Sequence, residues 1–114
     1  MKCLITDDSK MSLMMLNKII GNAHPDWEIL KASDGLQAIE IAKDNELDII
    51  LLDFNMPNMD GGEAAKILRP QFPNAKIAFL TANVQEAIQN LAIELKIDFI
   101  PKPITEAKVL KYVG

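Results

Sequence analysis

Residues 47–53 read Leu-Asp-Ile-Ile-Leu-Leu-Asp, a nearly continuous apolar run that ends on an acid. A strand of a parallel sheet covered by helices on both faces has this composition, whereas a strand with one wet face alternates polar and apolar residues. The stretch therefore predicts a central strand over residues 47–52, with Asp53 at its carboxyl end.

Four further short runs rich in Ile, Leu and Phe lie around this stretch, and longer amphipathic segments separate them. Strand–helix alternation repeated five times predicts right-handed crossovers, and hence a doubly wound parallel sheet with helices on both faces. Periodicity alone does not fix the order of the strands. The predicted strands are 2–6, 27–32, 47–52, 76–80 and 97–100, and the predicted helices are 10–22, 35–45, 62–69, 84–96 and 104–112.

The composition is that of one domain. A chain of 114 residues has the size of a single hydrophobic core, and 49% apolar residues argue against disorder. Sixteen acidic against twelve basic residues give a net charge of −4, which argues against binding to nucleic acid or an anionic membrane. Cys3 is the only cysteine, and we expect it to be buried in a strand. One unpaired cysteine without a signal segment favours the reducing cytoplasm.

Cap and turn residues mark the ends of several predicted helices. Ser33 or Asp34 can cap the second helix, and Asp60 can cap the third. Pro70 is expected to end the third helix, because proline has no amide hydrogen and clashes with the preceding turn. Gly61 is expected to allow backbone angles that a side chain would resist.

Polar side chains follow four of the predicted strands: Asp7 and Asp8 the first, Asp53 the third, Thr81 the fourth and Lys102 the fifth. The carboxyl ends of strands in an open α/β sheet form its ligand site, so we expect these side chains to converge. Three carboxylates suit Mg²⁺, which prefers oxygen ligands in near-octahedral geometry at ~2.0–2.1 Å. A hydroxyl and an ammonium beside them suit a phosphoryl group.

Each of these residues also has an ordinary interpretation. Asp8 or Ser9 can cap the first helix, threonine is common where strands end, and a lone lysine is usually a solvated surface charge. Asp53 has no capping role after a central strand, however, and Lys102 stands between two prolines that constrain its backbone. Taken together, the residues favour a site.

The chain resembles a response-regulator receiver domain (CheY-like) over essentially its whole length, which implies one receiver domain spanning residues 1–114. The resemblance also implies the flavodoxin-like strand order 2-1-3-4-5 and a cis peptide bond before Pro103. It rests on Asp7-Asp8, on Asp53 with the Met-Pro-Asn-Met-Asp-Gly run at 56–61, on Thr81 and on Lys102-Pro103.

The resemblance further implies a role for each site residue. Asp53 would accept a phosphoryl group, Lys102 and Thr81 would bind its oxygens, and the ring of Phe99 would move with Thr81 as a switch. Asn55 and Asn83, two residues beyond Asp53 and Thr81, should flank the approach of water and tune the lifetime of the phosphate. The implied Mg²⁺ ligands are Asp8, Asp53, the backbone carbonyl of Asn55 and, through water, Asp7.

The chain shows no Gly-rich phosphate loop, so the phosphoryl group must come from another molecule. The resemblance implies a phosphohistidine on a sensor histidine kinase or histidine phosphotransfer protein, and a downstream output protein or domain. Met11 and Met14, outside the apolar stripe of the first helix, are expected to form a docking patch for the donor. We expect that the protein is not a turnover enzyme and that the chain contacts neither nucleic acid nor a membrane.

Two other functions remain open at this point. An aspartyl phosphatase of the haloacid dehalogenase type needs a second acid two residues after the nucleophile, where this chain has Asn55. A receiver-shaped adaptor would bind partners without phosphorylation, which leaves the intact acids unexplained. No output domain follows Gly114, so we expect either a stand-alone switch or part of a longer regulator.

Overall fold

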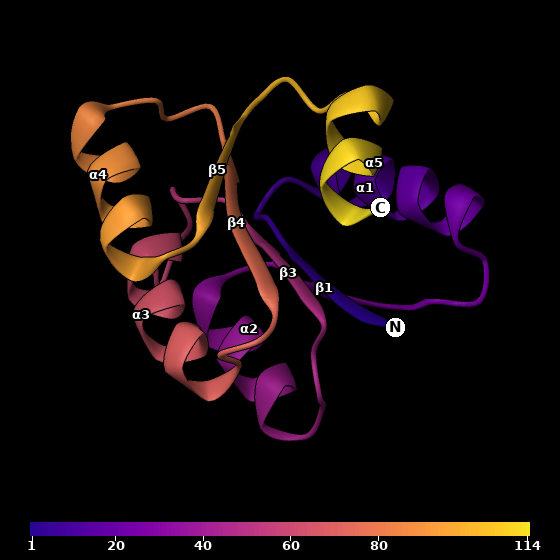
Figure 1. The fold of residues 1–114 in the computed structure, drawn as a ribbon, viewed down its shortest axis with the longest axis horizontal. Coiled ribbons are helices and arrows are strands. Elements are labelled where there is room, and N and C mark those ends of the chain that lie inside the picture. The colour runs from indigo at the N-terminus through magenta and orange to yellow at the C-terminus, as the bar shows by residue number, and fades with distance from the viewer.

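The computed structural model describes residues 1–114 and contains a five-stranded parallel sheet in the order β2-β1-β3-β4-β5. This order is the one that the resemblance implied, and the predicted doubly wound α/β fold is confirmed (Figure 1). The strands are β1 (Lys2–Thr6), β2 (Glu28–Ala32), β3 (Ile49–Leu52), β4 (Lys76–Thr81) and β5 (Asp98–Pro101).

Four helices connect the five strands, a fifth follows the last strand, and together they cover both faces of the sheet. Figure 1 shows α1 and α5 on one face and α2, α3 and α4 on the other. None of the helices combines the length and the hydrophobicity of a membrane-spanning segment. The helices are α1 (Lys10–Ala23), α2 (Gly35–Lys43), α3 (Gly61–Gln71), α4 (Glu86–Leu95) and α5 (Glu106–Val113).

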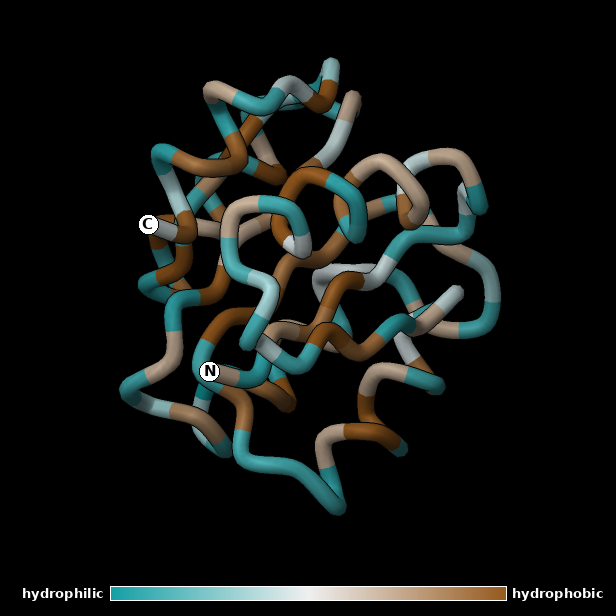
Figure 2. Tube along the Cα trace, turned by 90° about the vertical axis from the view of Figure 1, so that its right-hand side faces the viewer, coloured by the Kyte–Doolittle hydropathy of each residue, from teal (hydrophilic) through white to brown (hydrophobic).

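The central strand β3 divides the core into two layers. All four of its residues are buried; Ile50 and Leu52 face α2, α3 and α4, while Ile49 and Leu51 face α1 and α5. Figure 2 shows the alternation of hydrophobic and hydrophilic segments along the chain that this layering requires. Cys3 is fully buried in β1, as predicted, and burial raises the pKa of its thiol to about 12.

The helix caps bear out most of the expected signals. Ser9, rather than Asp8, caps α1 by accepting from the Ser12 amide, and Asp34 and Asp60 cap α2 and α3. Helix α3 ends near Pro70, as expected, but it continues through the proline to Gln71, two residues beyond the predicted range 62–69. Proline cannot donate its own helical hydrogen bond, yet the Phe72 amide beyond it still donates to the Leu68 carbonyl at 2.9 Å and closes the helix.

Gly61 has a different role from the one expected. Its backbone angles are ordinary for a residue with a side chain, but a Cβ there would collide with the carbonyl oxygen of Asp53. The left-handed residue of this loop is Asn58, with φ of 67°, and its amide donates to the Asp34 carboxylate at 2.7 Å. Gly61 therefore lets α3 begin directly against the end of β3.

Candidate phosphoryl and metal site

The site lies at the carboxyl ends of β1, β3, β4 and β5, at the point where crossovers leave β1 and β3 in opposite directions. Such a switch point opens a crevice beyond the strand ends. The register pairs Thr6 with Leu52, so the next residues, Asp7 and Asp53, emerge side by side. Thr81 pairs with Pro101, which brings Lys102 to the same edge.

Three carboxylates converge as predicted. Asp7, Asp8 and Asp53 each offer an oxygen, and these oxygens all lie within 4.8 Å of one another. Asp7 and Asp53 are buried, while Asp8 is exposed. Neighbouring and opposite ligands of an octahedral Mg²⁺ stand about 3 and 4 Å apart, so this all-oxygen group fits a hard divalent cation.

Backbone amides orient the two buried carboxylates. The Ser9 amide donates to Asp7 Oδ1 at 2.9 Å, and the Phe54 amide donates to Asp53 Oδ1 at 2.8 Å. The Oδ2 atom of each carboxylate is thereby left to face Lys102. Both aspartates are held by their own loops, so the site needs no distant residue to orient them.

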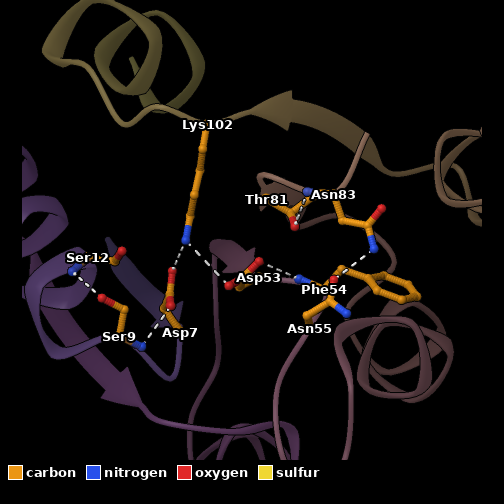
Figure 3. A network of polar contacts seen from close by, with 9 residues as sticks. All are labelled: Asp7, Ser9, Ser12, Asp53, Phe54, Asn55, Thr81, Asn83 and Lys102. Carbon is orange, nitrogen blue, oxygen red and sulfur yellow. Dashed lines mark hydrogen bonds and ion pairs between the residues drawn. The ribbon is translucent and has the colours of Figure 1, made fainter. Parts of the chain in front are cut away.

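The Lys102 side chain reaches between the two buried acids, as Figure 3 shows. Its Nζ lies 2.9 Å from Asp7 Oδ2 and 3.4 Å from Asp53 Oδ2. Burial by itself lowers the pKa of this ammonium, but the hydrogen bond that it donates to Asp7 and the charges of Asp53 and Asp7 outweigh burial and raise it. The Lys102–Pro103 peptide bond is cis, as predicted.

Asp53 is an electrostatically strained carboxylate. Burial raises its pKa above the ordinary value and the neighbouring charge of Asp7 raises it further, while Thr81 and Lys102 act in the opposite direction. One ammonium therefore does not fully compensate two buried carboxylates. A divalent cation at this position would supply the missing positive charge.

Thr81 is buried at the end of β4, and its hydroxyl accepts from the Asn83 amide at 3.1 Å. Asn83 in turn donates through Nδ2 to Asn55 Oδ1 at 2.8 Å, which links the two loops on either side of Asp53 (Figure 3). The sequence predicts that these two amides flank the site, and the hydrogen bond between them is a further finding of the structure. Asn83 Oδ1 also accepts from the Gln85 amide at 3.3 Å, so Asn83 additionally supports the start of α4.

The remaining predicted positions lie outside this cluster. Phe99 is half-buried in the edge strand β5 and lines an apolar hollow together with Tyr112 and the stem of Lys108. Met11 and Met14 are exposed on α1, as expected for a docking patch, each with 72% of its surface accessible.

The place of Lys108 near the end of the sequence predicts a lysine of a helix C-terminus. Lys108 lies instead in the first turn of α5, where its Nζ donates to the carbonyl oxygens of Pro101 and Pro103. No local sequence signal predicts this contact.

Comparison with known proteins gives a consistent result. A family model described as the response regulator receiver domain matches residues 3–114. The chain is 37% identical over 112 residues to the chemotaxis protein CheY of Thermotoga maritima, covering 96% of this chain and 92% of that protein.

A protein-glutamate methylesterase/protein-glutamine glutaminase of Pyrococcus horikoshii is 33% identical over 112 residues, covering 95% of this chain. The chain spans only 30% of the length of that relative. Among solved structures, the CheX–CheY–BeF₃–Mg²⁺ complex of Borrelia burgdorferi superposes with a TM-score of 0.89 at 30% identity, covering 98% of this chain and 85% of that chain.

Proposed function

The chain belongs to the response regulator receiver domain family, and on that premise we propose that Asp53 is its phosphoryl acceptor. The protein is a phosphorylation-activated switch of two-component signalling. The observation that carries the assignment of Asp53 is the position of Lys102 Nζ between the Asp7 and Asp53 carboxylates, beside the buried Thr81. We assign the whole of residues 1–114 to this one receiver domain.

In the reaction that we assign, a carboxylate oxygen of Asp53 forms a bond to phosphorus as the nitrogen–phosphorus bond of a phosphohistidine breaks. The bonding electron pair stays on the imidazole nitrogen of the donor. Lys102 neutralises charge on the transferring oxygens, and the Phe54 amide keeps the carboxylate oriented. A bound Mg²⁺ would supply further positive charge there. Its ligands in this proposal are Asp8, Asp53, the Asn55 backbone carbonyl and, through water, Asp7.

The same residues provide the switch. The Thr81 hydroxyl, now held by the Asn83 amide, would turn to a phosphoryl oxygen and give up that bond. The ring of Phe99, half-buried in β5, would move into the space that Thr81 leaves. Phe99 has no hydroxyl, so burial of ring area, worth up to about 1.5–3 kcal/mol on full burial, would favour the inward position.

Hydrolysis of the phosphate ends the signal. Water must approach phosphorus in line with the bond to Asp53, and the Asn55–Asn83 amide pair lies across the two loops that border Asp53. Neither amide is a general base, so the pair would act by orienting or obstructing water. Asp53 acceptance and loss of phosphate are the only chemistry that we assign, and the protein is not a turnover enzyme.

Receiver domains act through kinases and output proteins. The donor that we propose is the phosphohistidine of a sensor histidine kinase or histidine phosphotransfer protein, docking over the exposed Met11 and Met14 of α1. A downstream protein or domain would read the phosphorylated form, without direct contact of this chain with nucleic acid. The unpaired Cys3 and a kinase as donor both favour the cytoplasm as the place of action.

Incubation with acetyl phosphate and Mg²⁺, followed by intact mass, tests the assignment. We expect a stoichiometric, base-labile adduct on Asp53. Steady turnover of acetyl phosphate by the unmodified chain without an accumulating adduct would favour an aspartyl phosphatase instead. Complete absence of reaction would favour a phosphorylation-independent adaptor.

A further inference from the structure

The loop between β5 and α5 carries Lys102 but has few anchors of its own. Pro101 and Pro103 have no amide hydrogens, so Lys102 provides the only backbone donor of the three residues, and it bonds to the Thr81 carbonyl at 2.9 Å. Both prolines are exposed, so their carbonyls are free to accept from a side chain elsewhere in the chain as well as from water. Without such a side-chain donor, the backbone on either side of Lys102 would depend on this single bond.

Lys108 supplies that donor from the first turn of α5. Its Nζ lies 3.0 Å from the Pro101 carbonyl oxygen and 3.3 Å from that of Pro103, so one ammonium bridges the residues immediately before and after Lys102. Such charge-assisted bonds are stronger than those between neutral groups. The contact is made at the active-site end of α5, where the Lys108 amide is itself capped by Thr105 Oγ1 at 3.2 Å.

The helix that carries Lys108 is a firm support. Val109 and Val113 of α5 are buried in the core layer that also contains residues of α1. A group anchored on a packed helix can hold a loop more closely than another loop residue could. The Lys108 bridge therefore ties the loop that carries Lys102 to the core.

We propose that Lys108 is a positioning residue for phosphoryl transfer, which holds Lys102 Nζ between Asp7 and Asp53 by fixing the carbonyls of both flanking prolines. This inference rests on the proposed function of Asp53. Lys102 must meet two carboxylates and the transferring oxygens at once, and a displacement of about 1 Å in such an arrangement can cost up to about 100-fold in rate. Lys108 acts only through Lys102 and does not touch the phosphoryl group.

The same helix offers a matched control. Lys111 is exposed and borders the same apolar hollow as Lys108, and its side chain makes no hydrogen bond or ion pair. Its replacement removes the same charge from the same helix without affecting the loop. Lys108→Arg retains a cation with donors long enough to reach carbonyl groups, and Lys108→Met retains the apolar stem alone.

The first experiment measures the initial rate of adduct formation with acetyl phosphate and Mg²⁺, by intact mass, for the full chain and these variants. We expect Lys108→Met to form the adduct about 5–20-fold more slowly than the unmodified chain, and Lys111→Met to stay within about twofold of it. On a logarithmic scale of rate, Lys108→Arg should recover at least half of the decrease seen in Lys108→Met. Mg²⁺ affinity and the melting temperature should be nearly the same for all. Equal rates for Lys108→Met and Lys111→Met would overturn the inference while leaving Asp53 as the acceptor.

The second experiment is a double-mutant cycle with Lys102→Met. If Lys108 acts through Lys102, Lys108→Met should have an effect of less than about twofold once the Lys102 ammonium is gone, because residues that act as one unit are not additive. Full additivity of the two effects would contradict the positioning role. A failure of the proposed function would look different, since the unmodified chain itself would then form no adduct on Asp53.

Discussion

Acidic side chains gather at both ends of the sheet, but the two groups differ in kind. At the carboxyl end Asp7 and Asp53 are buried and share one ammonium, that of Lys102. At the amino end five acids surround a hollow, all of them exposed, and they form no group close enough to hold a metal ion. These five are Asp26, Glu28, Asp44, Glu46 and Asp48.

The difference shows that convergence and burial, more than acid content, distinguish a reactive site from a solvated surface. Water stabilises each exposed carboxylate separately, so the amino-end acids can stay ionised without a common partner. Asp53 lacks that option, and burial with the charge of Asp7 raises its pKa. Each of the following substitutions pairs an acid or amide of the carboxyl end with a counterpart from the amino end.

Loss of phosphorylation is the largest expected effect. Asp53→Asn removes the proposed nucleophile, and the rate of adduct formation with acetyl phosphate should fall by at least about 100-fold, the scale of losing a reacting group. Glu46→Gln at the amino end should react like the unmodified chain. Intact mass and peptide mapping check both variants, and phosphate located on Asp60 or on a serine would break the comparison.

Mg²⁺ affinity should change next most. Asp8→Ala deletes the exposed member of the carboxyl-end trio, and we expect Mg²⁺ to bind about tenfold or more weakly, with the fold retained. Glu28→Ala, which also removes an exposed acid, should leave the affinity unchanged. Calorimetric titration with Mg²⁺ measures both, and circular dichroism verifies the fold. Equal affinities in the two variants would mean that the trio is not the cation site.

The lifetime of the phosphate should respond to the Asn55–Asn83 pair. Asn83→Tyr or Asn83→Arg removes the 2.8 Å hydrogen bond between the two side-chain amides and fills the approach beside Asp53. We therefore expect decay of the adduct to slow by about three- to tenfold. Asn74→Arg, in an exposed loop at the amino end, is the control. The decay of the adduct in Mg²⁺ buffer and the melting temperature are both measured for each variant. A lower melting temperature with unchanged decay would reduce Asn83 to a support for α4.

The effect on stability should be the smallest, and it should be a gain where the preceding substitutions cause a loss or a slowing. The raised pKa of Asp53 means that the folded chain binds the proton more tightly than the unfolded chain does. The free energy of unfolding therefore falls as pH rises from the ordinary carboxyl range through the raised value. Without divalent metal at pH 7, Asp53→Asn should gain about 1 kcal/mol, or about 4 °C in Tm, whereas Asp26→Asn should not. Thermal melts in EDTA at several pH values decide this, and a loss of stability in Asp53→Asn would contradict the strained-carboxylate account.

Much of this molecule was predictable from its sequence because apolar runs and strand-end residues carry local information. Asp53 after a continuous run and Lys102 between prolines were enough to predict convergence at one edge of the sheet. The order of the strands was not predictable from periodicity, because alternating strands and helices are compatible with several orders of neighbours. It came from the resemblance to a family.

The residues that were misread depend on contacts between distant segments. The role of Gly61 is set by the carbonyl of Asp53, which only the packing of α3 against β3 brings near. The role of Lys108 is set by two carbonyls across a loop, and the Asn55–Asn83 bond joins two different loops. The spacing of residues predicts which face of a helix or a strand is buried, but it does not predict contacts between segments that are distant in the sequence.

Because Cys3 is buried, the reactivity of its thiol can report the opening of the sheet. The thiol lies in β1, between β2 and β3, with none of its surface accessible and a pKa of about 12. A thiol reagent therefore has no thiolate to attack until β1 separates from its neighbours. The labelling rate of this sulfur atom therefore measures how often the centre of the sheet opens. The influence of metal, phosphate or a partner on that frequency can be measured without adding a probe.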